Sequence, residues 1–305
     1  MNKYPLYIPS KWRSQYMITS KALTKMWLKH YIIVEPQEEE LYKKSIEKMS
    51  LSAEVIILDL KYKEKYETCD NLWLTKSTWP WPARNFAWDE SIKKWYKYHW
   101  VMDDNISDFK VYHNNQRITT HNEDFFAYME DFIQRYKNIY MWWPNYNMFA
   151  FWAKKLPAFV SNTRIYSCNF IKNDIPFRWR GRYNEDTILS LDILHAGYCT
   201  IQFNMFLQNK LWTQIIKWWN SDEFYFKEWK REEWERYTDK WTKEKSEMLA
   251  KVYPQYAKVK YKFNRIHHQV NYNHFKRQKF IKDKNWDIAK EEKKKKFIFK
   301  KICNK

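Results

Sequence analysis

The stretch Tyr98-His99-Trp100-Val101-Met102-Asp103-Asp104-Asn105 decides how this chain of 305 residues is expected to fold. Its first five residues are typical of a buried strand, and three polar residues follow directly. Two adjacent carboxylates at a strand end repel each other unless something positive binds between them. A hard divalent ion, Mg²⁺ or Mn²⁺, bound together with substrate phosphates is the natural partner. For an isolated Asp-Asp-Asn, a solvated turn or a helix cap is the alternative.

Short strand-like runs recur on both sides of this stretch, with helix-like segments between them. Strands are predicted at 6–8, 31–34 and 55–58, and helices at 19–28, 85–94, 123–136 and 187–196. This alternation predicts an α/β fold with a mostly parallel sheet and helices on both faces. Ligands of such sheets bind beyond the carboxyl ends of the strands. Residues 10–13, Glu35 and residues 103–105 are expected there.

The charge and the cysteine content indicate the compartment and the binding partners of the protein. The formal net charge is +19, and residues 276–305 carry 13 Lys/Arg against 4 Asp/Glu. This basic tail, set apart from a domain at 1–275, suits a polyanion such as nucleic acid, or is simply solvated. Four scattered cysteines predict reduced thiols in a cytoplasmic compartment. No signal peptide and no membrane span are expected.

Three further groups of residues could carry chemistry. Glu185 and Asp186 stand at the start of a predicted helix, as a general base at a helix N-terminus or as part of a cap. Arg84 and Asn85 begin another helix, where an anion can bind. His267 and His268 are weak evidence of a metal site, because adjacent side chains rarely reach one ion.

Tryptophan is abundant where the backbone usually requires glycine. The chain has 19 Trp and only 2 Gly, whereas an average protein of this length carries about 20 Gly. The turn Thr78-Trp79-Pro80-Trp81-Pro82-Ala83-Arg84-Asn85 is one such place. With indoles at 79 and 81 the backbone could not approach a phosphate closely, whereas with glycine it could.

Taken in order, these elements resemble the TET-associated glycosyltransferase family of bacteriophages and DNA-modification neighbourhoods, which are GT-A-type nucleotide-sugar glycosyltransferases. The similarity extends over about residues 4–275. It rests on the segments 7–14, 31–38, 78–85, 99–106, 182–187, 217–223, 241–246 and 267–272. The resemblance implies a GT-A-like, Rossmann-type mixed sheet that is mostly parallel.

The family pattern implies glycine at several positions where this chain has tryptophan: 12, 27, 73, 79, 81, 143, 218, 219 and 241. One replacement at so many sites points to the genetic code, with UGA meaning glycine in the source and translated as tryptophan. Trp88 and Trp100 are expected to be genuine. UGG codons at 79, 81, 218 and 219 would rule this hypothesis out.

The resemblance also implies a role for each candidate residue. Pro9, Ser10, Arg13 and Glu35 would line the base and ribose, with Arg84 and Asn85 near the nucleotide. Asp103, Asp104 and Asn105 match a DxD-like motif that holds Mn²⁺ or Mg²⁺ against the diphosphate. His268, or His267, would reach the metal. Asp186, or Glu185 beside it, would take the proton of the acceptor hydroxyl.

The implied acceptor is a hydroxymethylated pyrimidine in DNA, and the basic tail would suit binding to the DNA backbone. The expected compartment is the cytoplasm, which is that of the host if the gene belongs to a phage. Two alternatives remain open. One is a glycosyltransferase of the same fold that acts on a protein, lipid or glycan. The other is a non-catalytic nucleic-acid-binding module.

Overall fold

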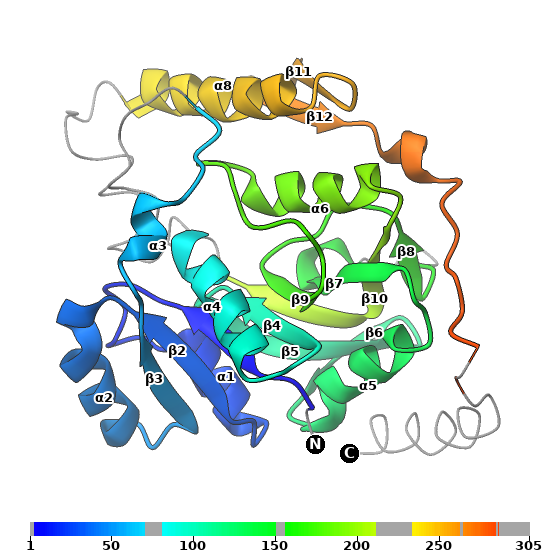
Figure 1. Cartoon of the computed structure of the whole chain (residues 1–305). Helices are drawn as coiled ribbons and strands as arrows, with labels where there is room; N and C mark the ends of the chain where they lie inside the picture. The colour runs from blue at the N-terminus through cyan, green and yellow to red at the C-terminus, as the bar shows by residue number, and fades with distance from the viewer. Residues whose placement is uncertain are drawn as a thin grey trace.

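The computed structural model describes residues 3–70, 81–150, 156–211, 234–262, 265–284 and 286, and the side chains of 234–242 and 265 are not included. Within these residues the chain forms a ten-stranded mixed sheet, a two-stranded sheet and seven α-helices. The predicted α/β class is therefore confirmed, and the arrangement is consistent with a Rossmann-like GT-A fold (Figure 1).

The N-terminal half of the large sheet is entirely parallel, in the order β3-β2-β1-β4. Its strands are β1 (Leu6–Pro9), β2 (His30–Val34), β3 (Ala53–Ile57) and β4 (Tyr98–Met102). The connecting helices are α1 (Ile18–Lys25), η1 (Pro36–Glu38), α2 (Glu39–Lys48), α3 (Lys61–Glu64) and α4 (Trp81–Lys93). The strands and helices predicted here are all present, with ends that differ by a few residues.

The second half is mostly antiparallel and continues in the order β9-β7-β10-β5-β6, with β8 paired to β10. Its strands are β5 (Ile106–His113), β6 (Gln116–Thr120), β7 (Ile139–Tyr146), β8 (Phe159–Ser161), β9 (Cys168–Lys172) and β10 (Cys199–Lys210). Its helices are α5 (Asp124–Ile133), η3 (Asn147–Phe149) and α6 (Glu185–His195). Asn114 and Asn115 turn the β5–β6 hairpin with positive φ, which asparagine tolerates.

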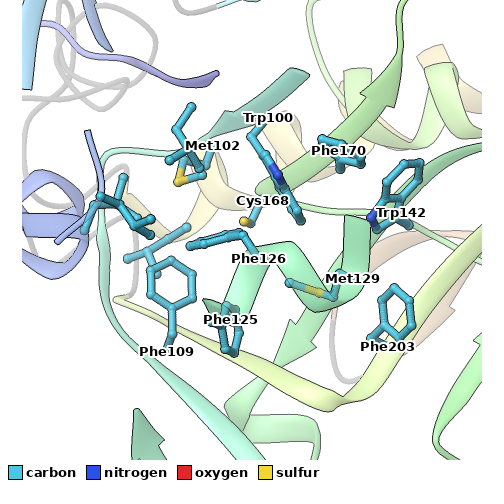
Figure 2. Close-up of a cluster of buried hydrophobic side chains, with 14 of the residues drawn as sticks. Trp100, Met102, Phe109, Phe125, Phe126, Met129, Trp142, Cys168, Phe170 and Phe203 are labelled. Carbon is cyan, nitrogen blue, oxygen red and sulfur yellow. The ribbon is translucent and has the colours of Figure 1, made fainter. Parts of the chain in front are cut away.

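Helices cover both faces of the sheet because successive strand residues point to opposite sides. On β1, Leu6 and Ile8 belong to the core shared with α1 and α5, whereas Tyr7 packs with α4. The first of these cores is almost wholly aromatic and aliphatic: Trp100 lies against Phe126, and Phe170 against Trp142 (Figure 2). These packed layers hold the strand ends that carry the site.

A C-terminal layer lies over α6, at the top of Figure 1. It consists of α8 (Trp234–Val252) and the hairpin of β11 (Ala257–Lys262) with β12 (Arg265–Val270), followed by η5 (Tyr272–Phe275). Met248 and Leu249 of α8 pack with Ile188 and Leu191 of α6. Beyond residue 275, Asn138 Nδ2 donates to the Lys279 carbonyl at 2.9 Å, so the start of the predicted basic tail runs along the domain.

Two tryptophans end helices in the left-handed backbone conformation. Trp27 and Trp95 have φ of 59° and 60° and are 83% and 93% exposed. In both places the residue and its successor donate back to carbonyls of the last turn, the same pattern with which Gly197 ends α6. Residues with a Cβ atom, unlike glycine, are strained in this conformation. Trp95 was not among the positions suggested by the family pattern.

Hydrogen bonding does not separate the buried tryptophans in this way, because Trp142 and Trp179, which are not expected to be glycine, have buried Nε1 atoms without a partner among the described residues. The Nε1 atoms of Trp88 and Trp100, expected to be genuine, donate to the Asn173 carbonyl and to Glu130. Trp143, expected to be glycine, is buried and its Nε1 finds no partner among the described residues. Trp81, also expected to be glycine, donates through Nε1 to the Arg182 carbonyl at 3.0 Å. Trp73, Trp79, Trp218 and Trp219 lie outside the described residues.

Replacing both Trp27 and Trp95 with glycine is expected to stabilise the protein. Each change relieves a left-handed residue and should raise the free energy of unfolding by about 1 kcal/mol. The matched control is Trp100→Gly, which empties a core site and should lower it by at least about 3 kcal/mol. Denaturant unfolding of the wild type and the two variants measures these changes, and a destabilised W27G/W95G variant would contradict the expectation.

None of the helices in the described ranges combines the length and the hydrophobicity that crossing a membrane requires. Cys69, Cys168 and Cys199, the cysteines within those ranges, are unpaired.

Candidate active site

Arg84 gathers three carboxylates at the centre of the site. Its Nη2 lies 2.6 Å from Asp103 Oδ1, and its Nη1 lies 2.7 Å from Asp186 Oδ1 and 3.3 Å from Glu185 Oε1. The guanidinium is 2% exposed and lies over the ring of Trp179 at 4.7 Å. A planar cation with a fixed fork of donors suits several carboxylates at once. The site therefore joins residues that lie up to 102 positions apart.

The fold brings these four residues together from three elements. Arg84 stands in the first turn of α4, Asp103 directly follows β4, and Glu185 and Asp186 open α6. Asn184 precedes α6 with φ of 56° and makes no side-chain cap. Its Nδ2 donates instead to the Lys245 carbonyl of α8 at 2.8 Å. The side chain of Asn184 therefore does not cap α6, and it ties the start of the helix to the layer above it.

Lys210, which no sequence motif indicated, completes the charge balance. It is the last residue of β10, and its Nζ lies 2.6 Å from Asp103 Oδ2 and 2.8 Å from Ser167 Oγ. Burial would raise the pKa of Asp103, but Lys210 and Arg84 together hold it at about 2. Asp103 is therefore a permanent anion that positions two cations.

Glu185 and Asp186 differ in how firmly they are held. Asp186 accepts from Arg84, from Asn169 Nδ2 at 3.2 Å and from the Ser167 amide at 3.3 Å. The contact of Glu185 with Arg84 is longer, and burial followed by the charge of Asp186 raises the pKa of Glu185 to about 7. A carboxylate with a pKa near neutrality is suited to accept a proton in a reaction.

Asp104 belongs to a second cluster, on the side of β1 and α2. Its Oδ1 accepts from Arg13 Nη1 at 2.6 Å and its Oδ2 from Ser10 Oγ at 2.7 Å. Tyr42 Oη lies 2.8 Å from Ser10 Oγ and accepts from the Arg13 amide. Predicted nucleotide-site residues Ser10 and Arg13 are thus brought to the strand edge beside the Asp-Asp-Asn turn, as expected.

Glu35 lies at the same edge but is engaged by cations. Lys63 Nζ lies 2.6 Å and Lys11 Nζ 3.2 Å from Glu35 Oε1, while Gln37 donates to Oε2. Nearby Glu38, which the sequence did not single out, is 1% exposed and accepts from the Trp12 amide. Burial raises its pKa to about 7, and Glu35 adds to the effect.

The predicted metal ligands do not fit a divalent ion as they lie. Both oxygens of Asp103 face cations, and both oxygens of Asp104 face Arg13 and Ser10. Asn105 donates through Nδ2 to the Leu211 carbonyl, and its Oδ1 is buried without a partner among the described residues. Within that part of the chain, no group of three or more His, Cys, Asp or Glu side chains could hold a metal ion. The metal requirement remains a prediction.

His268 approaches the site through the C-terminal layer. It lies on β12, where burial, then Lys245 and His267, lower its pKa to about 4. Lys245 of α8 interacts electrostatically with Glu185, Asp186 and Lys210. His268 is therefore linked through Lys245 to the acidic residues Glu185 and Asp186, and its role as a metal ligand remains a prediction.

Asn85 is hydrogen-bonded to the backbone of Trp179, and Pro9 is part of a strand. Asn85 Nδ2 donates to the Trp179 carbonyl at 2.8 Å, and the Trp179 amide donates to Asn85 Oδ1 at 2.9 Å. Asn85 thereby fixes the ring on which Arg84 lies, and its role near the nucleotide remains a prediction. Pro9 ends β1, directly before Ser10.

The mixed sheet, with acidic residues at the ends of its strands, is consistent with a Rossmann-like GT-A fold. The family model described as TET-Associated Glycosyltransferase matches residues 4–215. The chain therefore belongs to this family, which implies a glycosyltransferase. A comparison with curated proteins found no match. The matched range includes Arg84, Asp103, Glu185 and Lys210 and ends before α8.

Proposed function

We propose that the protein transfers a sugar from a nucleotide-sugar to a hydroxymethylated pyrimidine in DNA. The observation that carries the proposal is the convergence of Glu185, Asp186 and Asp103 on Arg84, beside Lys210, at the carboxyl ends of the strands. Membership of the family supports the transfer of a sugar. The proposal adds to this a nucleotide-sugar as the donor and DNA as the acceptor.

Glu185 suits the role of general base better than Asp186. With a pKa of about 7 it can take the proton of the acceptor hydroxyl, whereas Asp186 is committed to three donors. The acceptor oxygen then forms a bond to the anomeric carbon of the sugar, and the bond from that carbon to the diphosphate oxygen breaks. The nucleoside diphosphate leaves with the electron pair.

Positive charge must meet the leaving diphosphate as its charge develops. Arg84 is too deeply buried to do more than hold the carboxylates. The Lys210 side chain is 20% exposed and is kept charged by Asp103, which raises its pKa against the effect of burial. We assign Lys210 to the diphosphate, with the Ser10–Arg13–Asp104 cluster toward the nucleoside.

The DNA acceptor is supported by charge. A net charge of +19 favours binding to a polyphosphate, and this term is independent of sequence. A hydroxymethyl group inside a duplex would have to leave the stack to reach a buried carboxylate such as Glu185, which costs a few kcal/mol.

The direct test is transfer from a panel of nucleotide-sugars to duplex DNA with or without hydroxymethylated pyrimidines, in Mn²⁺ and in EDTA. Labelled sugar should appear only in the modified duplex, and Asp103→Asn should abolish transfer while salt-sensitive DNA binding persists. Equal loss of both in D103N would indicate misfolding. Turnover of nucleotide-sugars without transfer to DNA would favour a protein, lipid or glycan acceptor, and no turnover at all would refute the proposal.

A further inference from the structure

The β11–β12 hairpin presents a cationic surface that belongs neither to the family match nor to the carboxylate site. β11 reads Ala257-Lys258-Val259-Lys260-Tyr261-Lys262, and every residue after Ala257 is exposed. Neither strand contains an acidic residue. The hairpin lies beyond residue 215, where the match with the family ends.

The register of the hairpin sorts its side chains onto two faces. Lys258 pairs with Gln269 and Lys260 with His267, whereas Val259 pairs with His268 and Ala257 with Val270. Directly opposed residues share a face, and neighbours along a strand alternate. The face with Ala257 and Val270 packs on α8 and α6. The lysines therefore lie on the opposite face of the hairpin, which itself is at the top of Figure 1.

The three lysines of this face are uncommitted. The side chains of Lys258, Lys260 and Lys262 make no ion pair or hydrogen bond with another described residue, in contrast to those of Lys11, Lys63 and Lys210. Alternate residues of a strand repeat at about 6.6 Å, so the row spans about 13 Å. Measured along the axis of duplex DNA, that length covers about four phosphates of one strand.

The opposite face connects the hairpin to the reaction centre. His268 lies beside Lys245, which interacts with Glu185 and Asp186, and the Lys245 carbonyl holds Asn184 at the start of α6. A polyanion bound along the lysine row would thus rest on the layer that covers the general base.

We propose that the lysine row of Lys258, Lys260 and Lys262 binds the phosphate backbone of duplex DNA on the outer side of the C-terminal layer. The inference rests on the proposed transfer to DNA. The DNA backbone would then contact the C-terminal layer, whereas Arg13 and Lys210 at the strand ends would contact the nucleotide-sugar.

The test compares a K258Q/K260Q/K262Q variant with a control, K25Q/K44Q/K48Q, which removes three exposed lysines from α1 and α2 at the other end of the molecule. Binding to an unmodified duplex is measured over a range of salt concentrations. Each lost phosphate contact reduces the slope of log K against log salt by about 0.9, so the hairpin variant should lose about 2.7. The control should keep the wild-type slope, and thermal unfolding verifies that both variants are folded.

The outcomes separate this inference from the function on which it rests. If the wild type modifies and binds DNA but the hairpin variant keeps its slope, the inference is wrong and the proposed function stands. If the wild type neither binds nor modifies DNA, both fall. Loss of binding to anionic lipid vesicles with unchanged binding to duplex DNA would overturn the inference in favour of a membrane surface.

Discussion

Replacing Arg84 with methionine is expected to abolish sugar transfer and to destabilise the protein. The guanidinium is buried between Asp103, Asp186 and Glu185, and its removal leaves three carboxylates close together without their shared cation. Breaking a buried ion cluster costs about 3–5 kcal/mol. Arg84→Lys should fail to restore activity, because one ammonium cannot reach three carboxylates with the geometry of a guanidinium. Denaturant unfolding and transfer rates measure both effects.

Arg178→Met is the matched control for this prediction. Arg178 also lies over an indole, at 4.8 Å from the Trp88 ring, and pairs with one carboxylate, Asp89, but its side chain is 40% exposed. Exposed ion pairs contribute about 1 kcal/mol or less. The Arg178 variant should therefore keep its activity and nearly all its stability. Comparable losses in the two variants would show that Arg84 acts through indole packing rather than through the carboxylates.

Local pattern made much of the parallel half predictable. Strands β1, β2 and β4 are short apolar runs that end in polar residues, and the polar ends could be assigned to one edge because parallel strands share it. The hairpin of β5 and β6 was not predicted. β6 is exposed at four of its five residues, so it lacks the apolar alternation by which a strand is recognised.

Most residues of the candidate site could be selected from the sequence, but the contacts between them could not be predicted. Arg84, Asp103, Glu185 and Asp186 were each selected from the sequence, but nothing in it indicated that Asp103 and Asp104 would turn to opposite sides. That separation follows from the cations around them, Lys210 for one and Arg13 for the other. Lys210 ends a strand with no motif around it, and only the pairing of β10 with β5 brings it to Asp103.

Replacing Glu185 with glutamine is expected to remove the pH dependence of transfer along with most of the rate. A general base contributes about 100-fold to 10,000-fold. Because burial and Asp186 raise the pKa of Glu185 to about 7, the wild-type carboxyl is protonated and inactive below that pH. The wild-type rate should rise with pH through about 7, and the residual rate of E185Q should show no such rise. Initial rates at saturating donor between pH 5 and 9 measure this.

The stability of E185Q provides an independent check on the cause of that shift. A carboxyl whose folded pKa exceeds its unfolded value binds the proton more tightly when folded, so its contribution to stability is lost as pH rises toward about 7. Glutamine carries no charge, so E185Q should be more stable than the wild type at pH 8 and should lose this advantage at pH 4. Asp186→Asn removes the charge that helps to raise the pKa of Glu185, so this variant should keep the rise of rate with pH but show it at a lower pH. A pH-dependent rate that persists in E185Q would assign the base to another residue.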